Sequence, residues 1–198
     1  SWDVGQGAHD DGAPCMAAWQ ALTIIKKLGL RPRRTLRVVL WTNEENGLRG
    51  GVGYRQWVGD DVGNHVAAIE MDGGAERPIG FGFGLEGVSP EEGNPTYEAA
   101  FVKLQQIGRL LDGIGAGEIL RGGGGADIGP LMTAGVPGLG LRTVGEHYFD
   151  WHHTHGDTLD KVDIENFRRA MALLGVTGYV LADMPERLMP VRLIPADE

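Results

Sequence analysis

Four clusters of ionisable side chains, far apart along the chain, have the residue types that bind metal ions. They are His9-Asp10-Asp11, Glu44-Glu45, Asp72, and the run from His152 to Asp157, which contains three histidines. Carboxylates brought close together raise one another's pKa and resist ionisation unless a cation neutralises them. Carboxylates combined with neutral imidazoles suit divalent zinc. If the fold brings these clusters together, they would form a metal site.

Each cluster also has an ordinary structural explanation. Asp10-Asp11 precedes a helix, where acidic residues cap and complement the helix N-terminus. Glu44-Glu45 could be an exposed turn, and Asp72-Gly73-Gly74 is a common turn sequence. The histidine run is harder to explain in this way, although a surface loop with incidental metal affinity would also contain it. The metal-site hypothesis therefore depends on all four clusters together.

The elements expected around these clusters alternate between helix and strand. Apolar residues recur at helical spacing from Ala13 to Leu28, on a face that would include Met16 and Trp19. Further helices are expected at 95–111 and 128–134, and a last one begins after the N-cap Asp163. The apolar segments 35–42, 66–71 and 138–142 are typical of buried strands. This alternation predicts an α/β layer fold.

The order of these elements predicts that the clusters lie close together in the fold. Glu44-Glu45 follows the first expected strand, and Asp72 follows the second. In open α/β sheets, ligands bind beyond the carboxyl ends of the strands. The glycine-rich segment 113–127 is expected to be a loop near such a site, either ordered or mobile.

The composition limits the classes of protein to consider. The chain has 198 residues, 42% of them apolar and 23% charged, which suits one compact domain, and we find no internal repeat or linker. The net charge of −9 argues against nucleic acid as a partner. No apolar run approaches the roughly 20 residues of a membrane span. Cys15 is the only cysteine, so any metal must be held by His, Asp and Glu.

Other catalytic motifs are absent or fail in context. Gly82 to Gly87 has the spacing of a dinucleotide-binding loop, but Val88-Ser89-Pro90 follows where a helix should begin, so a glycine-rich turn is the better interpretation. The chain contains no phosphate-binding loop, no Gly-x-Ser-x-Gly elbow and no His-Glu-x-x-His pair.

Five segments, in order, resemble the co-catalytic zinc exopeptidases, and within them the subgroup that contains plasma glutamate carboxypeptidase, also called carboxypeptidase Q. The segments are Ser1 to Gly12 (SWDVGQGAHDDG), Val39 to Glu45 (VLWTNEE), Met71-Asp72, Ala134 to Gly138 (AGVPG) and His152 to Thr158 (HHTHGDT). The resemblance implies an α/β three-layer sandwich with a mixed, mostly parallel central sheet flanked by helices. It also implies one catalytic peptidase domain over residues 1–198.

The resemblance further implies roles for the metal ligands. Asp10 would bridge two zinc ions, with a cis peptide between Asp10 and Asp11. Glu45 and His153 would complete one zinc site, and Asp72 would hold the other zinc with Asp10. A carboxylate beside the metals but not bound to them can accept a proton from water, and the resemblance gives this role of general base to Glu44.

The choice of His153 among its neighbours rests on the family motif His-x-x-x-Asp-Thr, which fits His153 to Asp157-Thr158. His152 and His155 would then lie behind the ligands or on the substrate side. Asp157 would orient an imidazole through its second nitrogen, a common arrangement around metal-bound histidines. The nearby aromatic residues Tyr148, Phe149 and Trp151 could either line the substrate pocket or pack in the core.

The sequence departs from the family pattern at its start. In the family, a His-x-Asp motif directly precedes the Ser-Trp pair seen here as Ser1-Trp2, and its histidine is the remaining ligand of the zinc held by Asp72. We therefore expect a fragment of a longer chain that lacks this motif and the N-terminal strands of the sheet. A parent chain would bind two Zn2+ ions. This fragment is expected to bind one tightly and to be impaired.

The function implied by the resemblance is a zinc-dependent exopeptidase acting on dipeptides or short peptides. A homodimer and a secreted or periplasmic location are expected on the same ground. Two alternatives remain open at this point: a glutaminyl-cyclase-like transferase on the same scaffold, and a non-catalytic, peptidase-like binding module. Specificity for the amino or the carboxyl end of the substrate is not readable from the residues.

Overall fold

A four-stranded sheet lies at the centre of the molecule. The structure, a computed structural model, describes residues 4–91 and 93–194. The strands are β1 (Ala68–Glu70), β2 (Pro78–Gly84), β3 (Glu118–Arg121) and β4 (Gly138–Thr143), in the order β1-β4-β2-β3. The pairs β1–β4 and β2–β3 are parallel, whereas β2–β4 is antiparallel. The predicted α/β class with a mixed, mostly parallel sheet is confirmed.

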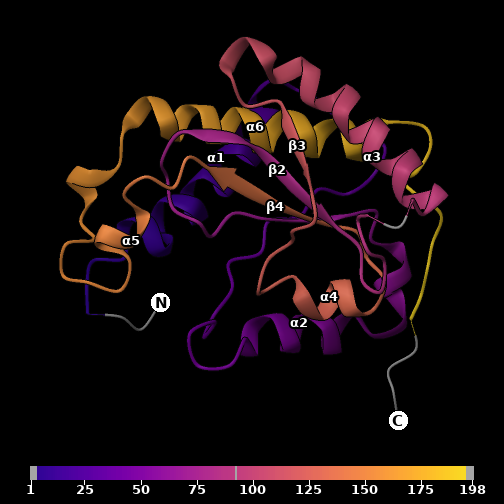
Figure 1. The fold of residues 1–198 in the computed structure, drawn as a ribbon, viewed down its shortest axis with the longest axis horizontal. Coiled ribbons are helices and arrows are strands. Elements are labelled where there is room, and N and C mark those ends of the chain that lie inside the picture. Colours follow the sequence, from indigo (N-terminus) through magenta and orange to yellow (C-terminus); the bar gives the residue numbers. More distant parts are fainter. Residues whose placement is uncertain (1–3, 92, 195–198) are drawn as a thin grey trace.

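Helices cover both faces of this sheet. Figure 1 shows α1 (Ala13–Lys27), α3 (Pro95–Gly108) and α6 (Ile164–Asp183) towards the top of the view, and α2 (Arg49–Val58) and α4 (Gly129–Thr133) below the strands. The short helix α5 (Tyr148–Trp151) lies at one end of the sheet. None of the helices in the described part of the chain is long and apolar enough to cross a membrane.

The apolar core has two parts, one for each face of the sheet. The larger part joins β2 and β4 to α3 and α6, and includes Phe81, Phe83, Tyr97, Leu104, Leu139 and Leu173. The smaller part lies beneath α2 and α4, and includes Val62, Ala68, Ile128, Leu131, Ala134 and Val136. Buried apolar surface on both faces explains why the sheet forms the middle of three layers.

Several expected elements form where the sequence placed them. The helix predicted at 95–111 is α3 followed by a 3-10 helix, and the one at 128–134 contains α4. The predicted strands 66–71 and 138–142 correspond to β1 and β4. Asp163 Oδ1 accepts a hydrogen bond of 2.8 Å from Asn166 N–H, so the predicted N-cap of α6 is also confirmed.

The strand predicted over residues 35–42 does not form in the described part of the chain. The segment has no regular secondary structure, and its end is held by a hydrogen bond of 2.9 Å from Gly50 N–H to the Thr42 carbonyl. A strand requires a neighbour that pairs with its main chain. The edge strand β1 pairs only with β4 among the described residues, so segment 35–42 remains outside the sheet.

The apolar face predicted for the first helix is only partly correct, because Ile25 is buried whereas Met16 and Trp19 are not. Helix α1 packs against α6 and buries its small residues, including Ala17 and Ala21. Met16 and Trp19, which were expected in the core, are 46% and 56% exposed. Alanines allow two helix backbones to approach closely, so the contact follows the small side chains rather than the large ones.

Candidate metal centre

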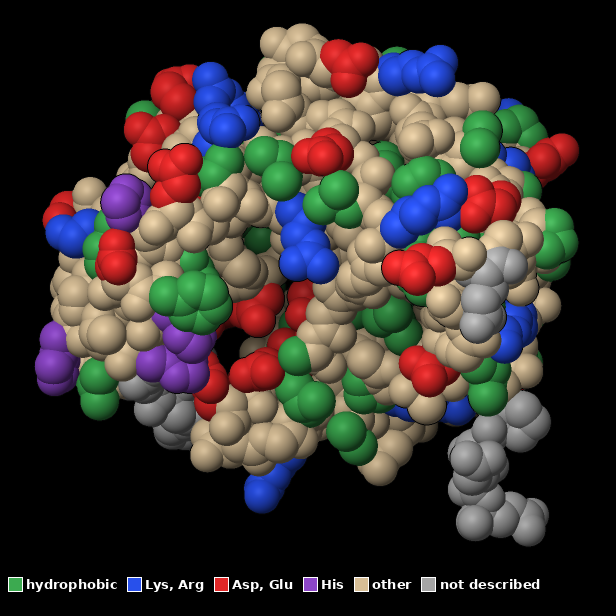
Figure 2. Space-filling view, viewed as in Figure 1, with side chains coloured by type: hydrophobic (Ala, Val, Ile, Leu, Met, Phe, Trp, Pro, Cys, Tyr) green, Lys and Arg blue, Asp and Glu red, His purple; other side chains and the backbone are tan. Residues whose placement is uncertain are grey.

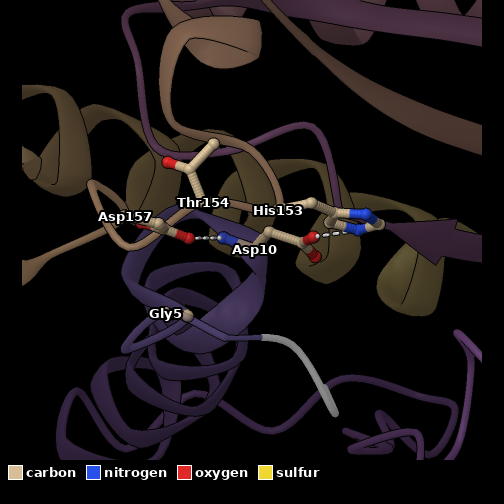
Figure 3. Close-up of a pocket in the computed structure, with 6 residues that line it drawn as sticks. Gly5, Asp10, His153, Thr154 and Asp157 are labelled. Carbon is tan, nitrogen blue, oxygen red and sulfur yellow. Dashed lines mark hydrogen bonds and ion pairs between the residues drawn. The ribbon is translucent and has the colours of Figure 1, made fainter.

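Three of the predicted metal ligands, Asp10, Glu45 and His153, are in contact in the structure. His153 Nε2 lies 2.8 Å from Glu45 Oε1 and 3.0 Å from Asp10 Oδ2. Figure 3 shows the side chains of Asp10 and His153 pointing towards each other beside a pocket. The three residues come from separate segments, so only the folded chain brings them together.

The loop that carries His153 also holds Asp10 in place. Asp157 accepts hydrogen bonds from two main-chain N–H groups, that of His9 at 2.7 Å and that of Asp10 at 3.0 Å. Figure 3 shows the bond to Asp10. We expected Asp157 to orient an imidazole, but within the described ranges its carboxylate binds the main chain instead. The Asp10–Asp11 peptide is cis, as the resemblance implied. The part of the first motif formed by Ser1 to Asp3 lies outside the described residues.

Glu44 and Glu45 lie in a tight turn, and their side chains have different surroundings. The main chain of this turn is closed by a hydrogen bond of 2.9 Å from Leu48 N–H to the Glu44 carbonyl. Glu45 points to His153, whereas Glu44 is partly buried beside the other acidic groups. Burial raises the pKa of Glu44, and the charges of Asp72 and Glu45 raise it further. Such a carboxylate takes up a proton more readily than an exposed one.

Asp72 lies beside this group. The pKa of Asp72 is raised overall. Burial and then the charge of Asp11 raise it, and the charges of His152 and His153 offset part of this rise. The side chains that offer donor atoms within 4.8 Å of one another are Asp10, His152 and His153. Asp72 is therefore in the electrostatic environment of the centre but outside this closest group of described donors.

His152 is closer to the centre than the sequence indicated. Its Nε2 lies 3.5 Å from Asp10 Oδ2, and its ring stacks on that of His153 with centroids 3.6 Å apart. We had placed His152 behind the ligands or on the substrate side. His153 adopts a positive φ of 58°, a conformation that brings the two neighbouring rings to the same carboxylate.

The other histidines of the predicted clusters have different surroundings. His9 is buried; its Nδ1 accepts a hydrogen bond of 3.1 Å from Ala75 N–H, and its Nε2 lies 3.1 Å from the Lys161 carbonyl. These contacts hold the ring between two main-chain groups. His155 is exposed on the loop. His9 therefore supports the structure, and His155 faces solvent.

The sequence left open whether the aromatic residues of α5 line the substrate pocket or pack in the core, and the structure gives each of them different surroundings. The ring of Tyr148 packs at 4.9 Å from that of His152, and burial together with the charges of Asp10 and Asp72 raises the pKa of Tyr148. Trp151 packs at 4.8 Å from His9. Phe149 is 81% exposed. Tyr148 therefore packs beside His152, and the ring of Phe149 also lies 5.7 Å from that of His152.

The donors that converge here fit a zinc ion. Asp10 Oδ2 is buried and accepts no hydrogen bond within the described ranges, although two imidazole nitrogens lie near it. Burial, and then the charges of Asp72 and Glu45, raise the pKa of Asp10 to about 7. Four ligands at about 2.0–2.2 Å in a tetrahedron stand roughly 3.3–3.6 Å apart. The donor separation of 3.5 Å falls within this range, whereas those of 2.8 and 3.0 Å are ion-pair distances that would lengthen when the ion binds.

The surface around these residues is hollowed and acidic. Figure 2 shows a hollow whose inner walls carry Asp and Glu side chains, with His side chains at its rim. Two buried acids of this region were missed from the sequence: Glu70, 7% exposed at the end of β1, and Asp127, 5% exposed in the loop before α4. A charged residue inside an apolar strand was the signal that could have identified Glu70.

Comparisons with known proteins agree with this site. The model of peptidase family M28 matches residues 1–177. Carboxypeptidase Q from Homo sapiens and from Bos taurus are 41% and 40% identical over 188 residues, which cover 95% of this chain and 38% of each relative. A crystal structure of a peptidase M28 precursor from Shewanella amazonensis SB2B is 32% identical and superposes with a TM-score of 0.83, covering 99% of this chain and 42% of that one. The chain thus spans less than half the length of these relatives.

Proposed function

The chain belongs to peptidase family M28, and from this premise we propose that its metal centre hydrolyses the peptide bonds of dipeptides or short peptides as a zinc-dependent exopeptidase. Residues 1–198 would act as one catalytic domain. The observation that carries the proposal is the convergence of Asp10, Glu45 and His153, with Glu44 next to them. The names of the relatives, which are carboxypeptidases, support the same class of reaction.

Asp10, Glu45 and His153 would hold one zinc ion, and Asp72 would hold a second together with Asp10. When bound, zinc supplies a water of lowered pKa and polarises the scissile carbonyl. Asp157 keeps Asp10 in position by accepting two main-chain hydrogen bonds. The buried Asp10 Oδ2, which faces the imidazoles of His152 and His153, is the donor atom that supports this assignment.

Glu44 would move the proton. It accepts a proton from the attacking water as the oxygen of that water bonds to the carbonyl carbon. It then gives the proton to the leaving nitrogen as the carbon–nitrogen bond breaks, so the products are a free acid and a free amine. The raised pKa of Glu44 supports this role, as does its position next to Glu45, which contacts His153. The family resemblance also leads us to propose an exported protein and a homodimer.

The test uses the zinc-loaded chain with leucyl-glycine as substrate and measures the leucine released. Replacing Glu44 by Gln removes the base but keeps the size of the side chain, so we expect kcat to fall by about 10²–10⁴-fold with unchanged zinc content. The matched control is Glu165→Gln, on the exposed start of α6, which should change neither value. Hydrolysis by the Glu44→Gln variant at the parental rate would overturn the proposal. Pyroglutamate formation from a glutaminyl peptide, without hydrolysis, would favour the cyclase reaction instead.

A further inference from the structure

Residues 12–43 carry a charge opposite to that of the whole chain. They contain six basic residues and no Asp or Glu, whereas the net charge of the chain is −9. The basic residues are Lys26, Lys27, Arg31, Arg33, Arg34 and Arg37. Charges in salt solution act mainly within about 10 Å, so this local excess attracts an anionic partner that the rest of the protein would repel. None of the six residues takes part in the proposed mechanism.

Two of the arginines fix this segment to the end of α6. The Arg34 guanidinium donates hydrogen bonds of 2.6 and 3.1 Å to the carbonyls of Met184 and Pro185. The main-chain N–H of Arg33 donates a bond of 3.2 Å to Asp183 Oδ1. The remaining basic residues of the segment are therefore presented from a backbone that is anchored to α6.

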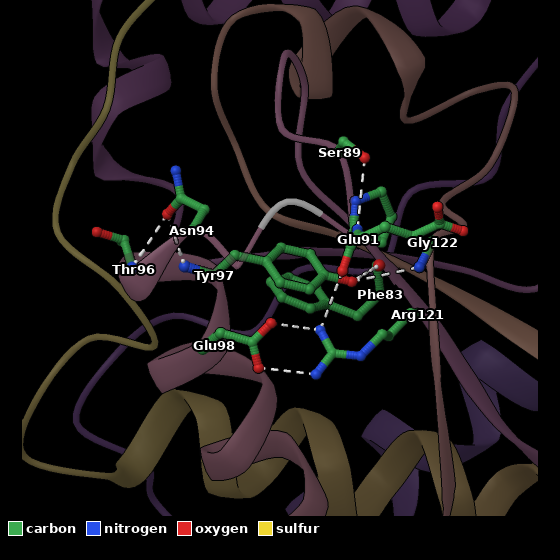
Figure 4. Close-up of polar contacts among 10 residues, drawn as sticks. Phe83, Ser89, Glu91, Asn94, Thr96, Tyr97, Glu98, Arg121 and Gly122 are labelled. Atoms are coloured by element: carbon green, nitrogen blue, oxygen red, sulfur yellow. Dashed lines mark hydrogen bonds and ion pairs between the residues drawn. The ribbon is translucent and has the colours of Figure 1, made fainter.

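The cations at the end of α1 are free of such contacts. The side chains of Lys26, Lys27 and Arg31 are exposed and have no ion pair or hydrogen bond within residues 4–91 and 93–194. Arg121, by contrast, is paired: Figure 4 shows its guanidinium donating bonds of 2.6 and 2.7 Å to the Glu98 carboxylate. The end of α1 thus presents three unpaired positive charges close together in the sequence.

Two leucines lie beside these charges, in a closed turn. Gly29 N–H donates a bond of 3.1 Å to the Lys26 carbonyl, and Leu30 N–H donates one of 3.2 Å to the Ile25 carbonyl. Gly29 has a φ of 70°, which favours glycine and ends the helix. Leu28 and Leu30 are 67% and 41% exposed. The turn therefore presents apolar and positively charged side chains together.

The outer face of α1 extends this exposed surface. Met16, Trp19 and Ile24 are exposed there. The opposite face of the helix, with Ala17 and Ala21, packs against α6 (Figure 1). Grouped apolar side chains on a protein surface mark interaction sites. Trp and aliphatic residues next to Lys and Arg are typical of helices that lie in the headgroup region of a bilayer.

We propose that α1 and the turn that follows it form a docking surface for a bilayer with anionic headgroups. Three exposed apolar residues would enter the boundary between headgroups and acyl chains, and three cations would contact the phosphate groups. These residues are Trp19, Leu28 and Leu30, and Lys26, Lys27 and Arg31, respectively.

A bilayer fits this surface better than an acidic protein does. The turn projects into open space, since a Cβ added to Gly29 would have no atom within 4 Å. A protein partner requires a matching shape, whereas a bilayer accommodates side chains that project to different depths. The positive charges select anionic lipid over neutral lipid.

The docking surface and the metal centre lie at opposite ends of α1. The helix begins two residues after Asp11 and spans 15 residues, a length of roughly 22 Å. Lys26 and Lys27 occupy its last turn. Binding to a bilayer at this end is therefore independent of the proposed function, and it can be measured without hydrolysis.

The test is sedimentation of the protein with vesicles of phosphatidylcholine alone, or of an equal mixture of phosphatidylcholine and phosphatidylglycerol. We expect the protein to sediment with the mixed vesicles and not with the neutral ones, although its own net charge is negative. Added salt should weaken this binding, because it screens the phosphate charges. A protein that sediments with neither kind of vesicle, or equally with both, would overturn the proposal.

Replacing Lys26 and Lys27 by Glu reverses two of the free charges. We expect this double variant to bind the mixed vesicles at least about tenfold more weakly, with an unchanged circular dichroism spectrum. The matched control replaces Arg77 and Arg109 by Glu, since both are exposed and neither makes an ion pair within the described ranges. The control changes the net charge equally and should bind as the parent does. An equal loss in both double variants would contradict the proposed surface.

Two further measurements separate lipid from other partners. Lys26→Gln with Lys27→Gln removes the charges without adding repulsion, and Leu28→Ser removes an apolar contact; each should also weaken binding to the mixed vesicles. Sedimentation velocity without lipid should give the same size for the parent and for the Lys26 and Lys27 variants. If these substitutions instead dissociate a dimer and leave vesicle binding unchanged, the surface is a contact between copies of the chain and the proposal is wrong.

Discussion

Asp157 Oδ2 accepts a hydrogen bond of 3.0 Å from the main-chain N–H of Asp10, across 147 positions of sequence. Its other oxygen binds the neighbouring N–H of His9 at 2.7 Å. Because His153 lies on the same loop as Asp157, this loop carries one predicted metal ligand and positions another. The distance between Asp10 and His153 therefore depends on a side chain that contacts neither the metal nor the substrate in the proposed mechanism.

Replacing Asp157 by Asn should weaken both the fold and the metal site. An amide offers one acceptor where the aspartate offers two, and its NH2 group would face a main-chain N–H in a buried position. We expect a loss of about 1–3 kcal/mol in the free energy of unfolding and a roughly 10–100-fold loss in zinc affinity. Urea unfolding and a competitive zinc titration measure the two effects. Asp163→Asn, the same change at the exposed N-cap of α6, should be nearly neutral.

Substitutions of the different histidines in the loop from His152 to Asp157 should have different effects on zinc binding. We expect the chain to hold one zinc ion tightly through Asp10, Glu45 and His153, which are in contact, and a second more weakly, because Asp72 has no ion pair with a histidine in the described part of the chain. His153→Ala should lower the affinity of the tight site by more than about 100-fold, beyond the usual effect of losing an outer partner. His155→Ala should leave it unchanged. Two tightly held ions per chain, or an effect of His155→Ala equal to that of His153→Ala, would contradict this assignment.

The metal-free protein should lose stability as the pH rises from 5 to 7. The pKa values of Glu70 and Asp127 are raised to about 7 in the folded state, from 4.5 and 3.8. In this window the folded state holds protons that the unfolded chain has released, so the free energy of unfolding falls with increasing pH. We expect a decrease of about 1–3 kcal/mol, measured by urea unfolding in the presence of a chelator. The double variant Glu70→Gln, Asp127→Asn should show a flatter profile, and an unchanged slope would contradict the assignment.

The contact between the glycine-rich loop and the sheet should tolerate no side chain. Gly140→Ala would place a methyl group 1.9 Å from the Gly124 carbonyl oxygen, so the loop or the strand must move. We expect a destabilisation of about 1–3 kcal/mol in thermal or urea unfolding. Gly53→Ala is the matched control, because Gly53 is exposed on α2 with no atom within 4 Å of its added Cβ. It should stabilise the protein by about 0.5–1 kcal/mol.

The positions of most elements follow from local sequence, whereas the faces they bury do not. The helical spacing from Ala13 onward predicts α1 well, because periodicity is a local property. Ala17 is buried in place of Trp19 because of how closely α6 approaches α1. The spacing of apolar residues in the sequence does not report how closely another helix packs. Segment 35–42 has the composition of a strand but no neighbour to pair with among the described residues. Strand β2 was missed because its alternating glycines resemble a turn.

The candidate site could also be predicted in part from the sequence. Residue types and the resemblance together were enough to select Asp10, Glu45 and His153, and the structure brings these three into contact. The role of Asp157 was misassigned, since its partners are main-chain groups that any sequence would provide. Asp127 was missed for a related reason. Its burial is produced by a loop of glycines, and their contacts with the sheet appear only in three dimensions.

The wide separation of the ligands along the chain also orders events during synthesis. Asp10 and Glu45 leave the ribosome well before His153, which lies 108 positions after Glu45. Of the predicted ligands, those that precede the loop from His152 to Asp157 are all carboxylates, and carboxylates bind zinc weakly without an imidazole partner. Zinc would therefore be captured only once this loop has closed onto Asp10. Metal binding at the proposed site would thus follow the folding of that loop.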